Sequence, residues 1–244
     1  PDGTSTIVGT TGLKPRGIAV DTAGNVYTVN TDSETVSKST PAGASTIFGT
    51  TGNAPVAIAI DVNGNVYTAN VDSDTVSKIT AGGISTILGI TGSGPRDLTV
   101  DMDGNVYTAN QDSDDVSKIA PDGTTTTLGT TGAGPRGIAL DADGNIYTAN
   151  RDTDNVSKIT PDGNSATLGA TALRPRGIAV DTYGNVYTSS TASNTLSKIT
   201  DTSTATFAAT GDTSPITITG LTNDTEYLMS LIAVNDAGES AASN

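Results

Sequence analysis

The chain has 244 residues, of which 34% are hydrophobic and 4% aromatic, and it contains no Trp. One thick hydrophobic core is therefore excluded, whereas several thin interfaces filled by Val, Ile, Ala, Thr and Tyr are within reach. A net charge of −14 disfavours nucleic acid and anionic lipid as partners, because both require clustered cationic side chains. No apolar run approaches the roughly 20 residues of a membrane span, so no membrane insertion is expected.

Two reactive residue types are missing, since the sequence holds neither Cys nor His. Disulfides and thiolate sites are excluded, and so are the usual general base and the usual zinc ligand. We therefore expect a protein that is not an enzyme. The acidic, Cys-free composition is typical of a secreted or cell-surface protein, which we expect to be bacterial.

The first expected element is the β-rich segment Thr4–Val8. It is followed by a unit of 40 residues that occurs five times over residues 1–200. In the first copy we expect four strands, over Gly17–Val20, Val26–Val29, Thr35–Lys38 and Ser45–Phe48, separated by turns rich in Gly, Asp and Asn. Four short strands in 40 residues is the pattern of one β-propeller blade, so the sequence predicts an all-β propeller of four-stranded blades.

The repeat resembles NHL-type and streptogramin-lyase-like propeller repeats. The residues that carry the resemblance are GPRGIALDADGNIYTAN, residues 134–150, and VSKITPDG, residues 156–163. The resemblance covers residues 1–200 and implies the fold, but such propellers act as enzymes, ligand binders and scaffolds alike. Lyases of this kind depend on a His base and metal-binding acidic residues, so the missing His makes that activity the least favoured.

Residues 201–244 depart from the repeat, and two interpretations stay open. The segment Gly220–Ser240 resembles the last strands of a fibronectin type III domain, which would leave a ring of five blades. Alternatively the tail is a divergent sixth blade with strands over Ile216–Thr219 and Glu226–Val234. Six blades are favoured, because the repeat residues recur after 40 positions at Pro215 and Tyr227. Residues 4–8 would then complete the last blade and close the ring.

Arginine follows the repeat proline in every copy except the second, where Val56 takes its place. These arginines are expected at one mouth of the central channel, where guanidinium groups bind carboxylate or phosphate through paired hydrogen bonds. The alternative is that each one pairs with a neighbouring Asp. The candidate ligand-binding residues are Arg16, Arg96, Arg136 and Arg176.

An aspartate ends each innermost strand, at the opposite mouth. A ring of carboxylates is a candidate site for a hard cation such as weakly bound calcium, the one cofactor considered. The alternative is a structural role, in which each Asp accepts backbone N–H bonds within its own turn. The residues concerned are Asp21, Asp61, Asp101, Asp141 and Asp181.

The tyrosine of the second strand, such as Tyr67, is expected to pack between blades rather than to line a sugar-binding groove. Because the copies are so alike, no single blade is expected to carry a unique catalytic pocket. We therefore expect a non-enzymatic extracellular module or scaffold that binds a protein or glycan partner. A structural subunit of a cell surface or fibre is the alternative function.

Overall fold

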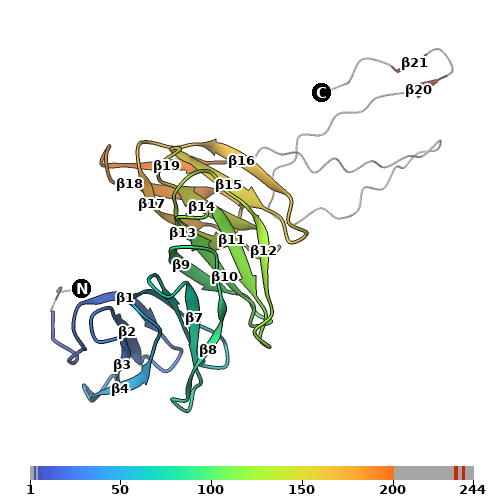
Figure 1. The fold of residues 1–244 in the computed structure, drawn as a ribbon. Coiled ribbons are helices and arrows are strands. Elements are labelled where there is room, and N and C mark those ends of the chain that lie inside the picture. Colours follow the sequence, from blue (N-terminus) through green and yellow to red (C-terminus); the bar gives the residue numbers. More distant parts are fainter. Residues whose placement is uncertain (1–2, 4, 201–233, 236–237, 240–244) are drawn as a thin grey trace, which may run out of the picture. The chain divides into compact units, whose positions relative to one another are not determined.

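The computed structural model describes residues 3, 5–200, 234–235 and 238–239 (Figure 1). Residues 1–201 form one compact unit and residues 202–244 a second. The described part of the first unit contains β-strands joined by turns, grouped into five antiparallel sheets. No helix in the part of the chain that the structure describes is long and apolar enough to cross a membrane.

Each sheet is formed by consecutive strands. The first sheet contains β1 (Pro15–Val20), β2 (Val26–Asn30), β3 (Thr35–Ser39) and β4 (Ser45–Thr50). The next three sheets repeat it as β5 (Pro55–Ile60), β6 (Val66–Asn70), β7 (Thr75–Ile79), β8 (Ser85–Ile90); β9 (Pro95–Val100), β10 (Val106–Asn110), β11 (Asp115–Ile119), β12 (Thr125–Thr130); and β13 (Pro135–Leu140), β14 (Ile146–Asn150), β15 (Asn155–Ile159), β16 (Ser165–Ala170). The fifth sheet holds the three strands β17 (Pro175–Val180), β18 (Val186–Ser190) and β19 (Thr195–Ile199).

The expected strands of the first repeat are confirmed, each longer by one or two residues at an end. The register follows the alternation of the sequence, with Tyr67 opposite Ala59 on one side and Lys78 on the other. A bulge interrupts the inner strand just after its proline, between Pro55 and Ala57. Because Pro lacks a backbone N–H, this position is where the ladder can be interrupted at least cost.

The inner strands β1, β5, β9, β13 and β17 pack side by side in chain order, which places each sheet against the next (Figure 1). The core lies between the sheets. Tyr67, Ala69 and Val76 of the second sheet pack against Leu98, Val106 and Ile119 of the third. Tyr67 is buried, as expected for packing between blades, and Lys78 Nζ lies 5.6 Å from its ring centroid.

The second unit is described only at β20 (Val234–Asn235) and β21 (Gly238–Glu239), which pair antiparallel. The predicted strand Ile216–Thr219 lies outside the described residues, and so does the predicted strand Glu226–Val234 except for Val234. The fibronectin-like interpretation and the sixth blade therefore remain predictions. The predicted closing strand is described from Ser5 onward, and Ser5–Val8 is not part of a strand.

Candidate functional site

The two rows of candidate residues lie at opposite ends of the inner strands. Each arginine is the second residue of its strand, as Arg136 is in β13, and each aspartate follows the last strand residue, as Asp141 does. A row of guanidinium groups and a row of carboxylates are therefore separated by the length of one strand. The repeat spacing predicts this arrangement, and the structure has it.

Each aspartate of the row is engaged in its own turn. Asp101 Oδ1 accepts bonds from the backbone N–H groups of Asp103 and Asn105, at 3.0 and 2.8 Å. Its Oδ2 accepts bonds from Asn105 Nδ2 and the Tyr107 hydroxyl, at 2.8 and 3.0 Å. Burial alone would raise the pKa of Asp101, but the hydrogen bonds outweigh it and hold the pKa below its ordinary value.

These hydrogen bonds are the ones expected if each aspartate stabilises its own turn. Gly104, in the same turn, has a φ of 83°, a backbone conformation that glycine adopts without strain. Within the described ranges no group of three or more acidic side chains is placed to hold a metal ion. The structure thus keeps the five aspartates in separate turns, and cation binding by them stays a prediction.

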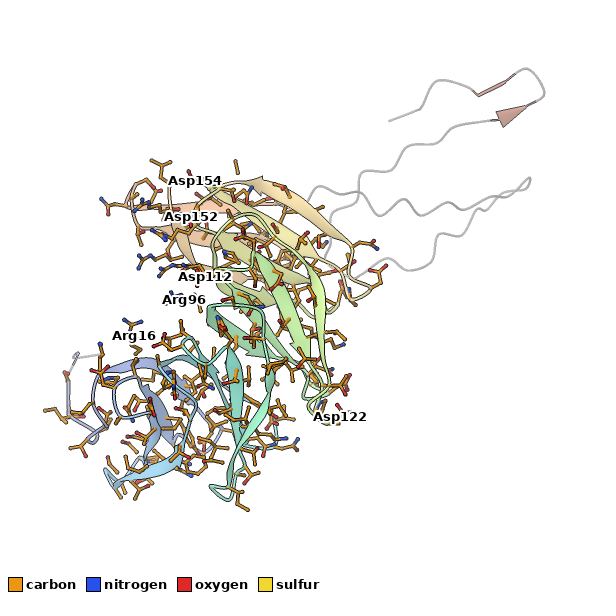
Figure 2. The ribbon with its side chains drawn as sticks, in the orientation of Figure 1. Arg16, Arg96, Asp112, Asp122, Asp152 and Asp154 are labelled. Carbon is orange, nitrogen blue, oxygen red and sulfur yellow. The ribbon has the colours of Figure 1, made fainter. Side chains whose placement is uncertain are left out.

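The arginine row behaves differently, because part of it forms a cluster. Burial lowers the pKa of Arg136 first, and the positive charges of Arg176, Arg96 and Arg151 lower it further. Arg136 therefore lies within electrostatic range of the other three guanidinium groups. We call Arg96, Arg136, Arg151 and Arg176 the arginine cluster. Arg16 is not among the groups that change the pKa of Arg136, and its side chain is exposed on the first sheet (Figure 2).

Several polar atoms around the cluster are buried without a hydrogen-bond partner. They are the Nε atoms of Arg96, Arg136 and Arg151 and the Oε1 atom of Gln111. A buried donor without an acceptor costs about 1–3 kcal/mol, and more when it is charged. Three donors and one acceptor on the third and fourth sheets thus have no protein partner among the described residues, and water or a ligand would supply one.

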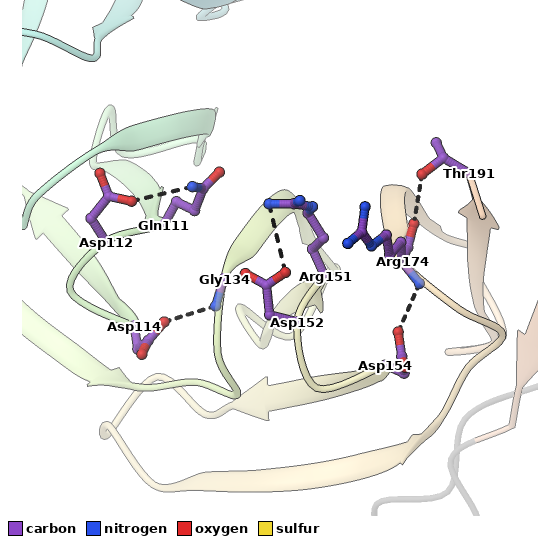
Figure 3. Close-up of polar contacts among 9 residues, drawn as sticks. All are labelled: Gln111, Asp112, Asp114, Gly134, Arg151, Asp152, Asp154, Arg174 and Thr191. Carbon is purple, nitrogen blue, oxygen red and sulfur yellow. Dashed lines mark hydrogen bonds and ion pairs between the residues drawn. The ribbon is translucent and has the colours of Figure 1, made fainter.

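Figure 3 shows the polar contacts of Arg151, one member of the cluster, and of aspartates that follow the second strands of the third and fourth sheets. Asp114 Oδ1 accepts the backbone N–H of Gly134 at 2.8 Å, and Asp154 Oδ1 accepts that of Arg174 at 2.7 Å. Among the described residues only Asp152 forms an ion pair with a guanidinium group, with 3.6 Å between its Oδ1 and Arg151 Nη1, and its charge raises the pKa of Arg136. The other ion pair of the described residues joins Lys14 to Asp32, so the alternative of local Arg–Asp pairing does not hold for the four predicted arginines.

Asp97, the residue after Arg96 in β9, is a departure from the repeat that the sequence interpretation missed. The other repeats carry Gly or Ala at this position: Gly17, Ala57, Gly137 and Gly177. Burial raises the pKa of Asp97 to about 6, although two backbone N–H groups donate to its carboxylate. A carboxyl that titrates near neutral pH is suited to exchange protons.

Gln111 and Arg151 were also missed, because each of them, like Asp97, differs from the residues at the same position of the other repeats. They follow the second strand of the third and fourth sheets, where the other repeats carry Thr31, Val71 and Thr191. Aligning the repeats against one another would have found all three, because each is a polar departure concentrated in two neighbouring copies. The copies therefore differ at these three positions, and the expectation that no single blade carries a unique catalytic pocket stays a prediction.

Solved structures similar to this chain share its fold. Virginiamycin B lyase from Staphylococcus aureus, as the selenomethionine protein, is 17% identical with a TM-score of 0.65, over 77% of this chain and 70% of that chain. Its catalytically inactive His-to-Ala variant with quinupristin is 18% identical with a TM-score of 0.66, over 76% and 69%. A chain of the nidogen/laminin complex is 19% identical with a TM-score of 0.64, over 75% and 74%. The repeated four-stranded sheets are thus of the β-propeller type.

No curated protein matches the chain in sequence. The model of the Virginiamycin B lyase family, in contrast, matches residues 2–230. The expectation that the protein is not an enzyme is overturned by this match and by the lyases among its structural relatives, because both point to an enzyme family. The histidine whose replacement inactivates the S. aureus lyase has no histidine counterpart in these 244 residues. The chain belongs to the Virginiamycin B lyase family.

Proposed function

We propose that this propeller binds an anionic group, a carboxylate or a phosphate, at the arginine cluster of its third to fifth sheets. The observation that carries the proposal is the set of buried, unpartnered Nε atoms on Arg96, Arg136 and Arg151. These atoms belong to a cluster in which the charges of Arg96, Arg151 and Arg176 lower the pKa of Arg136. An anion would satisfy the donors and neutralise the repulsion at once.

The chemistry of the side chains favours an oxyanion over a halide. A guanidinium group presents its donors in a planar fork that matches two oxygens of one carboxylate or phosphate. Gln111 Oε1 adds a buried acceptor, so a ligand that also carries an N–H or O–H group would leave no partner missing. The cluster is positively charged in a chain whose net charge is −14. The negative charge of the whole chain weakens the long-range attraction of an anion, so binding depends on the short-range geometry of the guanidinium groups.

Titration calorimetry with citrate, a tricarboxylate, and with inorganic phosphate tests the proposal. Arg136→Ala should weaken binding of the preferred anion by about 10- to 100-fold, the range for one charge-assisted hydrogen bond. Arg16→Ala is the matched control, because it removes the same residue type from the same repeat position outside the cluster. It should change affinity by less than about threefold, which is a loss of under 1 kcal/mol.

Equal losses in the two variants would show that anions bind through general surface charge. Absence of measurable binding to the wild-type protein at low salt would overturn the proposal. Circular dichroism of each variant separates a loss of the site from a loss of the fold.

A second candidate function is a lyase reaction of the family, with Asp97 as proton acceptor. Two observations favour it: the match to the family model, and the pKa of Asp97, raised to about 6 by burial, which suits a general base near neutral pH. Arg96 and Arg136 would stabilise negative charge that develops on the substrate as the proton leaves. This arrangement would replace the missing histidine by a carboxylate.

Incubation with quinupristin, the molecule in one of the lyase structures, tests this candidate by mass spectrometry of the products. Asp97→Asn should lower the rate by about 100-fold or more if the carboxylate is the base. No turnover by the wild-type protein, or equal turnover by the variant, would contradict the candidate without affecting the anion-binding proposal.

We propose in addition that the anion belongs to a protein or glycan partner outside the cell. The Cys-free acidic composition supports this setting. A glycan array read with the wild-type protein and Arg136→Ala tests it: retention on acidic glycans by the wild type alone is expected. Binding that is equal for neutral and acidic glycans would argue against it.

A further inference from the structure

The second sheet differs from its neighbours at the end of the inner strands that carries the arginine cluster. Val56 of β5 takes the place of Arg96 in β9 and of Arg136 in β13, since each is the residue after the proline of its strand. Val71 follows β6 as Gln111 follows β10. The second sheet therefore has two apolar side chains where the third sheet has a guanidinium group and an amide.

Backbone contacts show that these positions are equivalent and that the two sheets are joined there. The backbone N–H of Val71 donates to the carbonyl oxygen of Ala54 at 3.1 Å. One repeat later the N–H of Gln111 donates to the carbonyl oxygen of Gly94 at 2.9 Å. The N–H of Gly94 donates in turn to Asp74 Oδ1 at 2.8 Å, which connects this end of the third sheet to the second. The two valines thus belong to the sheet that borders the arginine cluster.

Neither valine is fully buried. Val56 packs on one side against the core between the second and third sheets, which contains Tyr67 and Leu98, and the rest of its side chain is open to solvent. Val71 is likewise half-buried. Partly open apolar side chains beside a small number of polar groups are typical of ligand sites. The valines therefore offer apolar surface to a ligand whose anionic group lies on the cluster.

Gln111 lies on the third sheet, between the valines of the second sheet and the guanidinium groups of the fourth. Its Nε2 donates to Asp112 Oδ1 at 3.2 Å, which fixes the orientation of the amide (Figure 3). Its Oε1 is buried and has no protein partner among the described residues. An amide oxygen is an acceptor only, so the ligand group that satisfies it carries an N–H or an O–H.

Three chemical features thus follow one another from sheet to sheet: apolar surface, a hydrogen-bond acceptor and guanidinium groups. The sheets that carry them pack in this order through β5, β9 and β13 (Figure 1). A peptide that ends in an apolar residue offers the matching set, namely a side chain, an amide N–H and a terminal carboxylate. A fatty acid carboxylate has no N–H, and inorganic phosphate has no apolar part. Each of these would leave one feature unused.

We propose that this end of the protein binds the carboxyl terminus of a peptide or protein whose last residue is apolar. The terminal carboxylate binds to Arg96 and Arg136, and the amide N–H of the last residue donates to Gln111 Oε1. The side chain of the last residue packs on Val56 and Val71. This inference rests on the proposed anion binding and names the class of ligand that the site takes.

Titration calorimetry with three acetylated tripeptides tests the ligand class. The first ends in Gly-Gly-Leu with a free carboxylate, the second in Gly-Gly-Gly with a free carboxylate, and the third in Gly-Gly-Leu with a terminal amide. The first should bind about tenfold more tightly than the second or better, because it buries a larger apolar side chain. The third should bind about tenfold more weakly than the first or worse, because it lacks the charge that the guanidinium groups bind.

The variant Val56→Arg tests where the apolar side chain binds. It introduces the residue that the other four repeats carry at this position, so we expect the fold to be retained. It should reduce the preference for Leu over Gly to less than about threefold, while citrate binds as tightly as before or more tightly. Val62→Arg is the matched control, because it replaces an exposed valine of the same repeat in the turn after β5, at the opposite end of that strand. This control should leave the preference for Leu unchanged.

The outcomes separate this proposal from the anion binding on which it rests. Equal binding of the first two peptides by a protein that still binds citrate overturns the carboxyl-terminus proposal and leaves the anion site in place. Equal binding of the first and third peptides also overturns it. An unchanged preference for Leu in Val56→Arg overturns the contact with the second sheet. If the wild-type protein binds neither citrate nor any of the peptides, the proposed anion binding itself is wrong.

Discussion

Asp97 Oδ2 accepts a hydrogen bond from the backbone N–H of Ile138 at 3.1 Å, which joins the inner strand of the third sheet to that of the fourth. Its Oδ1 accepts the N–H of Leu98 at 2.9 Å. No other repeat can make this connection through a side chain, because the equivalent residues are Gly or Ala. The carboxylate therefore links the two sheets that also carry Arg96 and Arg136.

The half-buried carboxyl of Asp97 should make stability depend on pH. The pKa of Asp97 in the folded protein, about 6, lies above the ordinary value of 3.8. The contribution of this carboxyl to the free energy of unfolding is therefore present below pH 3.8 and is lost as the pH rises through 6. Between pH 4 and pH 7 the free energy of unfolding of the wild type should fall by about 2 kcal/mol relative to Asp97→Ala.

Urea unfolding at a series of pH values measures this difference. Asp122→Ala is the control, because it removes a carboxyl from an exposed turn. Parallel profiles for the wild type and Asp97→Ala would show that the carboxyl does not titrate in this range.

The fold was largely predictable from the sequence, because each repeat carries its own turns and alternation. The turn from Asp101 to Asn105 and the strand around Tyr107 follow from local preferences that recur every 40 residues. Which arginines form a cluster was not predictable from the repeat alone. Arg16 and Arg136 occupy the same repeat position, yet only Arg136 is partly buried between two flanking sheets.

Three departures from the repeat were missed because the repeat was interpreted through what its copies share. Asp97, Gln111 and Arg151 stand out only when the copies are compared with one another. Their contribution to a site depends on the third and fourth sheets lying side by side. The raised pKa of Asp97 is likewise a property of burial, which the sequence of one strand does not contain.

The close approach of the inner strands β13 and β17 predicts that replacing two glycines by alanine will lower stability by different amounts. A Cβ atom on Gly137 would collide with the backbone oxygen of Arg176, whereas one on Gly177 would meet only Ser189 Oγ, at 2.7 Å. Gly137→Ala should therefore lower stability by about 1–3 kcal/mol, the usual cost of overpacking, because β13 and β17 must separate. Gly177→Ala should cost less, since the Ser189 side chain can rotate.

Thermal unfolding of both variants followed by calorimetry provides the comparison. Gly137→Ala should also weaken citrate binding, because Arg136 precedes it in the same strand. Equal melting temperatures in the two variants would contradict the close approach of β13 and β17.

The turn role of the aspartate row predicts a specific loss on removing one charge. Asp101→Asn cannot accept bonds from both Asn105 Nδ2 and the Tyr107 hydroxyl at its amide nitrogen, so stability should fall by about 2–4 kcal/mol. Asp103→Asn in the same turn is the control and should be nearly neutral. The pKa of Asp101 is lower in the folded protein than its ordinary value of 3.8. Its contribution to stability is therefore lost as the pH falls below 3.8, so Asp101→Asn and Asp103→Asn should become equally stable in acid.

Calcium separates the turn role from the cation site. The turn role predicts that millimolar calcium leaves the melting temperature of the wild type unchanged. A rise that disappears in Asp101→Asn would instead support weak cation binding at this row.

The most direct measurement of anion binding by the arginine cluster is nuclear magnetic resonance of the arginine Nε–H groups during a titration with citrate. The Nε–H signals of Arg96, Arg136 and Arg151 should shift together and saturate, because these donors have no protein partner among the described residues. The signal of Arg16 should stay in place. Shifts of equal size at Arg16, or no saturable shift at Arg136, would contradict an anion site at this cluster.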